Sequence, residues 1–385
     1  MLGVNERTFR RWLTRYEGKG AEGLLDERLG KIAHNGAAVD EVMALCGLYE
    51  ERYRAFRVAH FYDKYRDLHQ GSRSYGGVKK RLQEAGLVER AKKRGVHRRK
   101  RPRRPMKGMM LHQDGSQHQW IEGAHWYLIV TMDDADNEIY SAFFVKEEGR
   151  WSSFRGVQEE IETHGLFCSF YTDRGSHYWY TPSAGGKIDR MRPTPFGRAM
   201  EQLGIEFIAA YSPEARGRSE RMFGTLQGRL PLELKLEGIE DMTAANQFLK
   251  ERFLPTFNER FCVQAQETTS AFVSYTGTLK REDILCVQEA RIVNKDNTVS
   301  YRQKQLQIPS DLYRYSYAKS RVKVHEYANG EVGLFHGHRC LGRYGSDGVF
   351  GLFPETERLR APDAGGSPHP CGRPQIPPMK TEDCL

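Results

Sequence analysis

Three short stretches between residues 110 and 145 constrain the fold of this 385-residue chain more than any other feature. Each carries apolar residues interrupted or bounded by polar ones, and they read MLHQDGSQHQW (110–120), HWYLIVTMDD (125–134) and EIYSAFFV (138–145). Short runs of this kind are typical of strands, and the Asp/Asn-rich segment at 133–137 is typical of a turn. We therefore expect three consecutive strands here.

After residue 150, helix-like and strand-like segments alternate. We expect helices at 151–165 and 194–204, strands at 166–173 and 205–213, and a further helix that begins near residue 216. Three leading strands followed by this alternation predict a mixed α/β sheet with helices on its faces. The stretch TAANQFLKERFLPTFNERF (243–261) predicts another helix, which Pro255 bends or divides.

Residues 1–35 predict an amphipathic helix that fits the second helix of a helix-turn-helix domain, truncated because no first helix precedes it. Asn5 is placed to cap this helix, and one face carries Phe9, Trp12, Leu13 and Tyr16. A generic amphipathic surface helix is the alternative. The other faces carry cations that we expect to contact DNA, namely Arg7, Arg10 and Arg11.

Residues 36–90 predict a second small helical DNA-binding unit, with a plain helical hairpin as the alternative. In its segment SYGGVKKRLQEAGL, Ser74 is placed to cap a helix that directs Val78 and Leu82 inward. The same helix directs Lys79 and Lys80 outward, where we expect them to contact DNA.

The segment AKKRGVHRRKRPRRPMK (91–107) contains many cations, two prolines and no acidic residue. Charge repulsion and proline predict an extended linker. Such a segment can follow DNA phosphates and contribute salt-dependent, sequence-independent affinity, although an inert linker is the alternative. The residues expected to bind DNA in this way are Arg98, Arg99, Lys100, Arg101, Arg103 and Arg104.

The remaining segments predict a different architecture. Short strand-like runs with an Asn329-Gly330 hairpin signal predict a small antiparallel barrel at 266–345. Residues 346–385 are rich in Gly and Pro and poor in aliphatic side chains, which predicts a disordered tail.

The composition excludes several classes of protein. The formal net charge of +9 favours a polyanionic partner. Seven cysteines without a C-x-x-C pair give no zinc-ribbon or thioredoxin-like pattern and suit a reducing compartment. The longest apolar run, WYLIVTM (126–132), is too short to span a bilayer, and we expect the protein to be cytoplasmic.

Three acidic residues occupy related places in the predicted sheet. Asp114 lies in its first strand, Asp173 ends its fourth strand, and Glu220 lies on the helix after its fifth strand. Two neighbouring strands and a flanking helix can bring three carboxylates to one edge, where their oxygens suit Mg²⁺ or Mn²⁺. Two such ions about 4 Å apart can promote phosphoryl transfer. The alternative for Asp173 is an ordinary strand-end turn.

Four motifs carry a resemblance that goes beyond this spacing. HQDGSQHQW (112–120), LIVTMDDAD (128–136), YTDRGSHY (171–178) and YSPEARGRSERMFGTLQGRL (211–230) together resemble the integrase-core transposases of bacterial insertion sequences, closest to the ISNCY-type group. The resemblance implies a ribonuclease-H-like catalytic core at 108–265. By position, Asp114, Asp173 and Glu220 match the family's Asp-Asp-Glu triad, which binds two Mg²⁺ or Mn²⁺ ions per active site.

The resemblance also implies a reaction and its partners. Hydrolysis at the transposon end releases a 3′-hydroxyl, which then attacks target DNA. The expected partners are double-stranded DNA, as terminal inverted repeats and as target, and further copies of the same chain at the nucleoid. The alternatives are a catalytically inactive or domesticated DNA-binding protein and a nuclease acting on RNA–DNA hybrids.

Several residues near the triad allow two interpretations. We favour Glu220 over Glu214, because Glu214 falls in the turn before the helix. Asp133 and Asp134 are expected to form a turn, with metal binding as the alternative. His118 either assists at the phosphate or the metals, or makes a structural hydrogen bond. Arg218 and Arg221 flank Glu220 and either hold DNA phosphates or cover a solvated surface.

Overall fold

The computed structural model describes residues 5–25, 38–90, 101–183, 186–211, 217–310 and 312–351. Its contacts divide the chain into two compact units. The first unit comprises Met1–Glu148, Phe167–Arg174 and Ile208–Phe272, and the second comprises Gly149–Leu166, Gly175–Phe207 and Val273–Leu385. Of the expected DNA-binding residues, Arg98, Arg99 and Lys100 lie outside the described residues, as does 352–385 of the expected tail.

The first helix, α1 (Glu6–Lys19), forms where the sequence predicts it and is followed by the 3₁₀ turn η1 (Gly20–Leu24). The Asn5 side chain caps it by accepting a hydrogen bond from the Arg7 amide at 3.0 Å. None of its residues is buried, and Phe9, for example, is 49% exposed. The helix is therefore confirmed, but its place in a helix-turn-helix domain is not.

Three helices form the next module: α2 (Val39–Arg52), α3 (Val58–His69) and α4 (Tyr75–Glu84). Ser74 caps α4 by accepting a hydrogen bond from the Gly77 amide. Val78 and Leu82 are fully buried, as expected, and they pack with aromatic side chains that include Tyr53 and Phe61. This aromatic core holds the module together, and the module is more than a helical hairpin.

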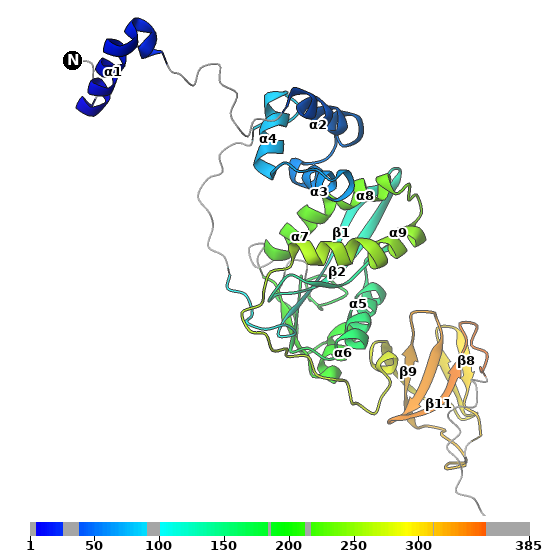
Figure 1. Cartoon of the computed structure of the whole chain (residues 1–385). Helices are drawn as coiled ribbons and strands as arrows, with labels where there is room; N and C mark the ends of the chain where they lie inside the picture. Colours follow the sequence, from blue (N-terminus) through cyan, green and yellow to red (C-terminus); the bar gives the residue numbers. More distant parts are fainter. Residues whose placement is uncertain are drawn as a thin grey trace, which may run out of the picture. The chain divides into compact units, whose positions relative to one another are not determined.

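Five of the described strands form a mixed sheet (Figure 1). Its order is β3-β2-β1-β4-β5, in which β1 pairs antiparallel with β2 and parallel with β4. The predicted mixed sheet is thus confirmed, although β4 and β5 are shorter than expected. The strands are β1 (Leu111–Ile121), β2 (Ala124–Asp133), β3 (Ile139–Val145), β4 (Ser169–Thr172) and β5 (Glu206–Ala209).

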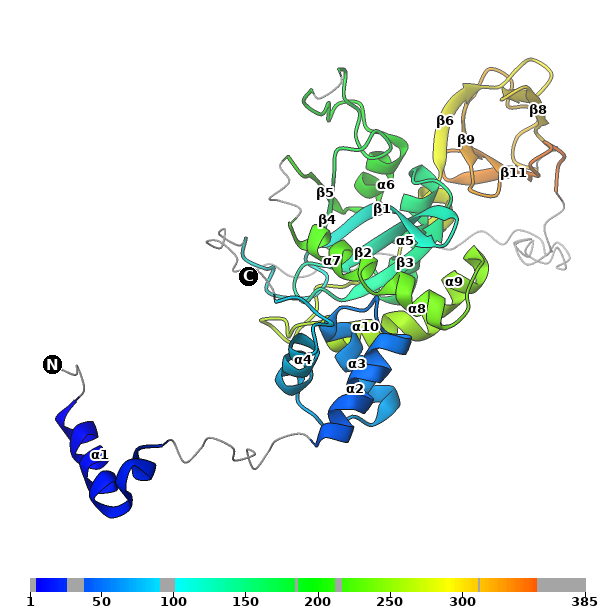
Figure 2. The same ribbon diagram turned by 90° about the horizontal axis from the view of Figure 1, so that it is seen from above.

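A run of helices covers one face of strands β1 to β3 (Figure 2). Its core contains Trp120, Leu128 and Phe144 from the sheet, together with apolar side chains of the helices. Pro255 divides the expected long helix, because a π-helical segment, η3, precedes the helix that contains it. The elements are α7 (Gly217–Gln227), α8 (Leu230–Leu236), α9 (Met242–Phe248), η3 (Leu249–Phe253) and α10 (Leu254–Phe261).

The second unit contains α5 (Arg150–Thr163), α6 (Pro195–Leu203) and α11 (Arg281–Ile284). Phe154 of α5 stacks on Phe196 of α6, with ring centroids 5.5 Å apart. The Arg198 guanidinium of α6 donates to the carbonyl oxygen of Ile284 at 3.0 Å and to that of Cys286. These contacts join α6 to the C-terminal strands.

Those strands form two sheets, so the expected barrel is wrong as a closed structure. One sheet has the order β11-β10-β9-β6, and β7 and β8 form a separate hairpin that shares its core. Among the described strands, β6 and β11 remain opposite edges. The Asn329-Gly330 hairpin between β9 and β10 is confirmed. The strands are β6 (Val287–Ile292), β7 (Thr298–Tyr301), β8 (Lys304–Gln307), β9 (Arg321–Glu326), β10 (Val332–His336) and β11 (Arg339–Tyr344).

Two further expectations can be compared with this fold. Residues 346–351 are not part of a disordered tail, because Phe350 forms a β-bridge with Tyr344. No described helix combines the length and the apolar character that a bilayer crossing requires.

Candidate active site

Asp114 lies in the middle of β1, opposite Val130 of β2, and is 9% exposed. Its Oδ1 accepts a hydrogen bond from the Gly115 amide at 3.0 Å. In a strand, alternate residues share a face, so His112 and Ser116 lie on the same side of β1 as Asp114. His118 also shares this side, but four residues of strand separate it from Asp114 by about 13 Å. That distance removes His118 from the group that could share a metal with Asp114.

Asp173 directly follows β4, which runs parallel to β1. The parallel register pairs His112 with Tyr171. Continued by two residues, the same register would set Asp173 beside Asp114, at the roughly 4.8 Å spacing of adjacent strands. Asp173 is half-buried. Because β4 ends at Thr172 and its pairing with β1 ends at His112 and Tyr171, the closeness of the two aspartates stays a prediction.

Glu220 lies in the first turn of α7 and is exposed. Two contacts fix α7 along the sheet. Near its end, Gln227 Nε2 donates to Ser116 Oγ of β1 at 2.8 Å. Near its start, the Arg218 guanidinium pairs with Asp134, just beyond β2. Glu220 lies between these points, on the same helix face as Gln227 two turns later. Its rival Glu214 lies outside the described residues.

The three carboxylates do not yet form a complete metal-binding cluster. In the part of the chain that the structure describes, no group of three or more His, Cys, Asp or Glu side chains is arranged to hold a metal ion. Asp114 and Asp173 each follow by two residues a register pair of β1 and β4, His112 and Tyr171, and α7, which carries Glu220, contacts β1 through Gln227. The donor set is nevertheless suitable, since carboxylate oxygens are the ligands that Mg²⁺ and Mn²⁺ prefer.

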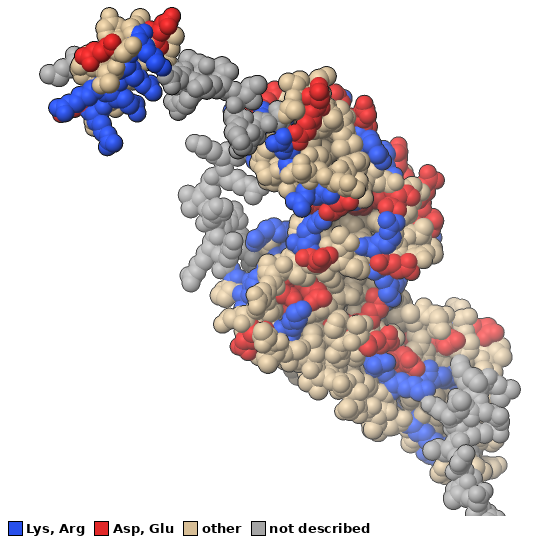
Figure 3. Space-filling model, viewed as in Figure 1, with Lys and Arg blue, Asp and Glu red and all other residues tan. Residues whose placement is uncertain are grey.

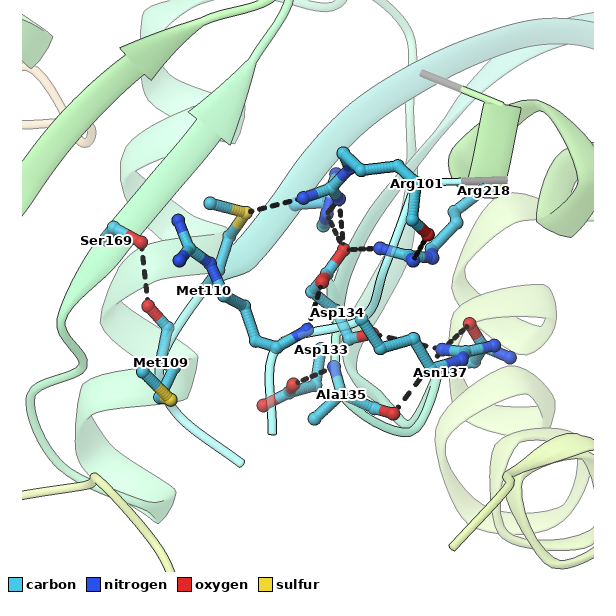
Figure 4. Close-up of polar contacts among 12 residues, drawn as sticks. Arg101, Met109, Met110, Asp133, Asp134, Ala135, Asn137, Ser169 and Arg218 are labelled. Carbon is cyan, nitrogen blue, oxygen red and sulfur yellow. Dashed lines mark hydrogen bonds and ion pairs between the residues drawn. The ribbon is translucent and has the colours of Figure 1, made fainter. Parts of the chain in front are cut away.

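Asp134 is the centre of a buried polar network (Figure 4). Its side chain is fully buried and accepts hydrogen bonds from the guanidinium groups of Arg101 and Arg218. His112 Nε2 lies 2.8 Å from Oδ1, and the Arg104 amide donates to Oδ2 at 2.8 Å. Arg218 also donates to the Arg101 carbonyl oxygen at 2.7 Å. The turn expected at Asp134 is thus present, but its carboxylate is an anchor for three cationic or polar side chains.

The ring of Tyr171 completes this arrangement. It lies 5.0 Å from the His112 ring and 5.8 Å from the Arg101 guanidinium carbon, measured to its centroid. We call Asp134, Arg101, His112, Tyr171 and Arg218 the Asp134 network. His112, Tyr171 and Arg218 stand two positions before Asp114, Asp173 and Glu220, respectively.

Burial and charge set the protonation of this network. Burial alone would raise the pKa of Asp134, but the hydrogen bond and charge of His112 and the charge of Arg218 outweigh it and lower that pKa. Burial lowers the pKa of His112 despite the neighbouring Asp134 carboxylate. An ionised Asp134 therefore accepts a hydrogen bond from the N–H of the neutral His112 ring. Next to it, burial raises the pKa of Asp133 to about 6.

Several cations expected on DNA are instead engaged inside the first unit. Arg101 and Arg218 pair with Asp134, and Arg103 donates to the Asp134 carbonyl oxygen at 3.0 Å and to Asn137 Oδ1 at 2.8 Å. The Arg104 amide also binds Asp134. Arg101 and Arg103 are nevertheless exposed and Arg104 is half-buried, so DNA contact by these residues stays a prediction, although their contacts tie the segment to the first unit. The linker prediction is therefore wrong for residues 101–107, which pack against the β2–β3 turn.

The remaining candidate cations lie on exposed helices. Arg7, Arg10 and Arg11 are exposed, and Figure 3 shows Lys and Arg side chains gathered on one side of α1. Lys80 on α4 is exposed and Lys79 is half-buried. Arg221 is exposed and donates to the carbonyl oxygen of Gly217 in its own helix.

The chain is similar in sequence to two bacterial proteins over a large part of its length. No protein-family model matches the chain. It is 30% identical over 345 residues to y4bF of Sinorhizobium fredii (strain NBRC 101917 / NGR234), a protein named as a candidate transposase, and this match covers 88% of the chain and 74% of y4bF. It is also 30% identical over 236 residues to the transposase for insertion sequence IS1202 of Streptococcus pneumoniae, covering 61% of the chain and 50% of that protein. The chain belongs to the transposase family, and it is a DNA transposase.

Solved structures with partial similarity include retroviral proteins. A chain of the simian T-cell lymphotropic virus intasome in complex with PP2A regulatory subunit B56 gamma is 14% identical, with a TM-score of 0.35 and coverage of 75% of this chain and 91% of that one. The HTLV-2 integrase catalytic core domain in complex with magnesium is 16% identical, with a TM-score of 0.31 and coverage of 42% and 92%. Similarity at this level carries no conclusion about the site.

Proposed function

We propose that this transposase cleaves transposon ends and joins them to target DNA by two-metal phosphoryl transfer. Asp114, Asp173 and Glu220 would hold two Mg²⁺ or Mn²⁺ ions. The chain spans about three quarters of y4bF and half of the IS1202 transposase. The reaction of a complete transposase is therefore proposed for this chain.

The observation that carries the proposal is the convergence of three residues that precede the carboxylates. His112 and Tyr171 are register partners on β1 and β4, and Arg218 and His112 both contact Asp134. Because residues two apart on a strand share a face, Asp114 and Asp173 would continue side by side from the first two. Glu220 follows Arg218 by about 3 Å of helix rise. Residues two apart on a helix point to nearly opposite sides, so Glu220 joins the two aspartates only when its side chain turns toward them.

The protein residues have separate tasks in this reaction. Asp114 and Asp173 offer anionic oxygens from rigid, paired strands. Glu220 is exposed at the start of α7, and completion of the site requires its side chain to turn toward the two aspartates. When bound, the metal ions activate the attacking oxygen and stabilise the leaving oxygen of the phosphodiester. Water is the nucleophile in end cleavage and the DNA 3′-hydroxyl is the nucleophile in joining, so one site serves both steps.

The proposed partners are double-stranded DNA, as terminal inverted repeats and target, and further copies of the chain. The net charge of +9 favours binding to DNA phosphates. The exposed cations of α1 and α4 and Arg221 are the described residues proposed to make these contacts. Arg98, Arg99 and Lys100 are proposed on sequence alone.

The test uses the full chain and duplexes that carry the inverted repeats flanking its coding sequence. We expect nicking at the repeat end with Mg²⁺ or Mn²⁺ and none with EDTA. Asp114→Asn, Asp173→Asn and Glu220→Gln should each reduce nicking by at least about 10³-fold, since a metal ligand is lost. Glu240→Gln, which changes an exposed acid after α8, is the matched control and should keep full activity. Undiminished nicking by the three site variants would refute the assignment.

A further inference from the structure

Asp134 contacts residues that stand two positions before the proposed metal ligands, but Asp134 is not itself a proposed ligand. It binds His112, two residues before Asp114, and Arg218, two residues before Glu220. Through His112 it also reaches the ring of Tyr171, two residues before Asp173. The three segments that carry the carboxylates are therefore linked at Asp134 through residues that stand two positions before Asp114, Asp173 and Glu220.

The contacts of the Asp134 network restrict the movement of the segments that they join. Asp134 is fully buried, the Arg218 side chain is 14% exposed and the His112 side chain is 3% exposed. Arg101 adds a second guanidinium on the same carboxylate and lies against Tyr171. Buried charged hydrogen bonds of this kind have few alternative partners, so they hold strand and helix in one relative position.

Charge gives Asp134 a second effect. Arg218 and Glu220 are two residues apart in the first turn of α7. With Asp134 ionised, the Arg218 guanidinium is neutralised away from the metal ligands. Without that charge, Arg218 could pair with a carboxylate of the triad and compete with the cation for it.

We propose that Asp134 is the positioning residue of this active site, which fixes β1, β4 and α7 so that their three carboxylates bind the metal ions together. This role rests on the proposed function of Asp114, Asp173 and Glu220. Residues behind metal ligands typically change metal affinity or activity by about 10–100-fold when they are replaced. We expect Asp134→Asn to raise the half-saturating Mg²⁺ concentration for nicking by this factor.

Asp136 provides a matched control in the same turn. Its side chain is also buried and ion-paired, with Lys107 Nζ at 2.9 Å, and its described partners do not include the three residues that stand two positions before the proposed ligands. Asp136→Asn should lower the melting temperature of the protein while leaving its metal dependence unchanged. A purely structural Asp134 would behave in the same way.

The experiment measures three quantities for the full chain and each variant. These are the melting temperature, Mn²⁺ binding by the loss of the free-ion paramagnetic resonance signal, and the Mg²⁺ dependence of nicking. Asp134→Asn should weaken Mn²⁺ binding about 10-fold or more at temperatures where the variant is folded. Equal Mn²⁺ affinity for Asp134→Asn and wild type would overturn the proposal.

A second pair of variants keeps the test valid if Asp134→Asn does not fold. Arg218→Ala leaves Arg101 and His112 on Asp134, and it should weaken Mn²⁺ binding about 10-fold, with partial recovery in Arg218→Lys. The Arg218→Ala effect should vanish in the Glu220→Gln background, since it acts through Glu220. A loss that is equal in both backgrounds would overturn the proposal. Full nicking by Glu220→Gln alone would instead refute the proposed function.

Discussion

Glu233 of α8 fastens the α2–α4 module to the rest of the first unit, and its replacement gives a well-defined stability prediction. Its carboxylate accepts hydrogen bonds from His60 Nε2 at 2.7 Å and Lys64 Nζ at 2.6 Å, both on α3. The exposed fractions of these side chains are 13% for Glu233, 2% for His60 and 20% for Lys64. Glu233→Gln removes the charge and sets an amide donor against one of the two donors, because the two contacts are made to different carboxylate oxygens.

The magnitude follows from the burial of the three groups. Removing one partner of a buried ion pair costs about 3–5 kcal/mol, and the partial exposure of Lys64 places this case at the lower end. We therefore expect Glu233→Gln to reduce the free energy of unfolding by about 3 kcal/mol. In a domain of 150–250 residues that corresponds to a fall of roughly 6–12 °C in melting temperature.

Thermal unfolding of the purified protein measures this change, and the same helix supplies the control. Glu237 pairs with Arg252, whose side chain is 63% exposed, at the end of α8. Glu237→Gln should cost less than about 1 kcal/mol, since exposed ion pairs contribute little. Similar losses for Glu233→Gln and Glu237→Gln would refute the reasoning that burial gives the Glu233 contacts their strength.

Two further predictions concern pH and backbone conformation. Burial lowers the pKa of His60, and the hydrogen bonds from His60 and Lys64 lower the pKa of Glu233 despite its burial. A group with a lowered pKa stabilises the fold above its unfolded pKa and loses this stability as the pH falls toward its folded pKa. Because Glu233 raises the pKa of His60, its replacement leaves burial to lower that pKa further, so acid titration from pH 6.5 to 4.5 should lower the melting temperature less in wild type than in Glu233→Gln. Gly108 has φ +77°, and an added Cβ would lie 3.0 Å from Phe272, so Gly108→Ala should cost about 1–3 kcal/mol in chemical denaturation. Gly224→Ala, in open space on α7, should be neutral or stabilising, and an equal cost for both would contradict the strain argument.

The periodicity of the sequence was sufficient to predict the order of strands and helices. The runs at 110–145 are short, largely apolar and separated by turn residues, and β1, β2 and β3 lie where these runs predict them. The predicted break at Pro255 is also present, because proline cannot donate the helical hydrogen bond. Strand ends were less predictable: β4 is four residues long, since pairing partners rather than local pattern decide where a strand stops.

The Asp134 network could not be predicted from the sequence. Arg101 and Arg218 lie 33 and 84 positions from Asp134, and an Asp-Asp pair after a strand is equally typical of a solvated turn. The same cause explains the error at 101–107. A basic segment without local acids predicts a free linker, but Asp134, Asp136 and Glu138 neutralise it from another part of the chain.

The central claim is that Asp114, Asp173 and Glu220 share divalent cations. The most direct measurement is a crystal structure of the full chain bound to its end DNA and soaked with Mn²⁺, with data collected at a wavelength where manganese scatters anomalously. We expect anomalous peaks from manganese within about 2.5 Å of oxygens from all three carboxylates. Manganese bound without one of the three, or Glu220 remaining turned away while the metal is bound, would contradict it.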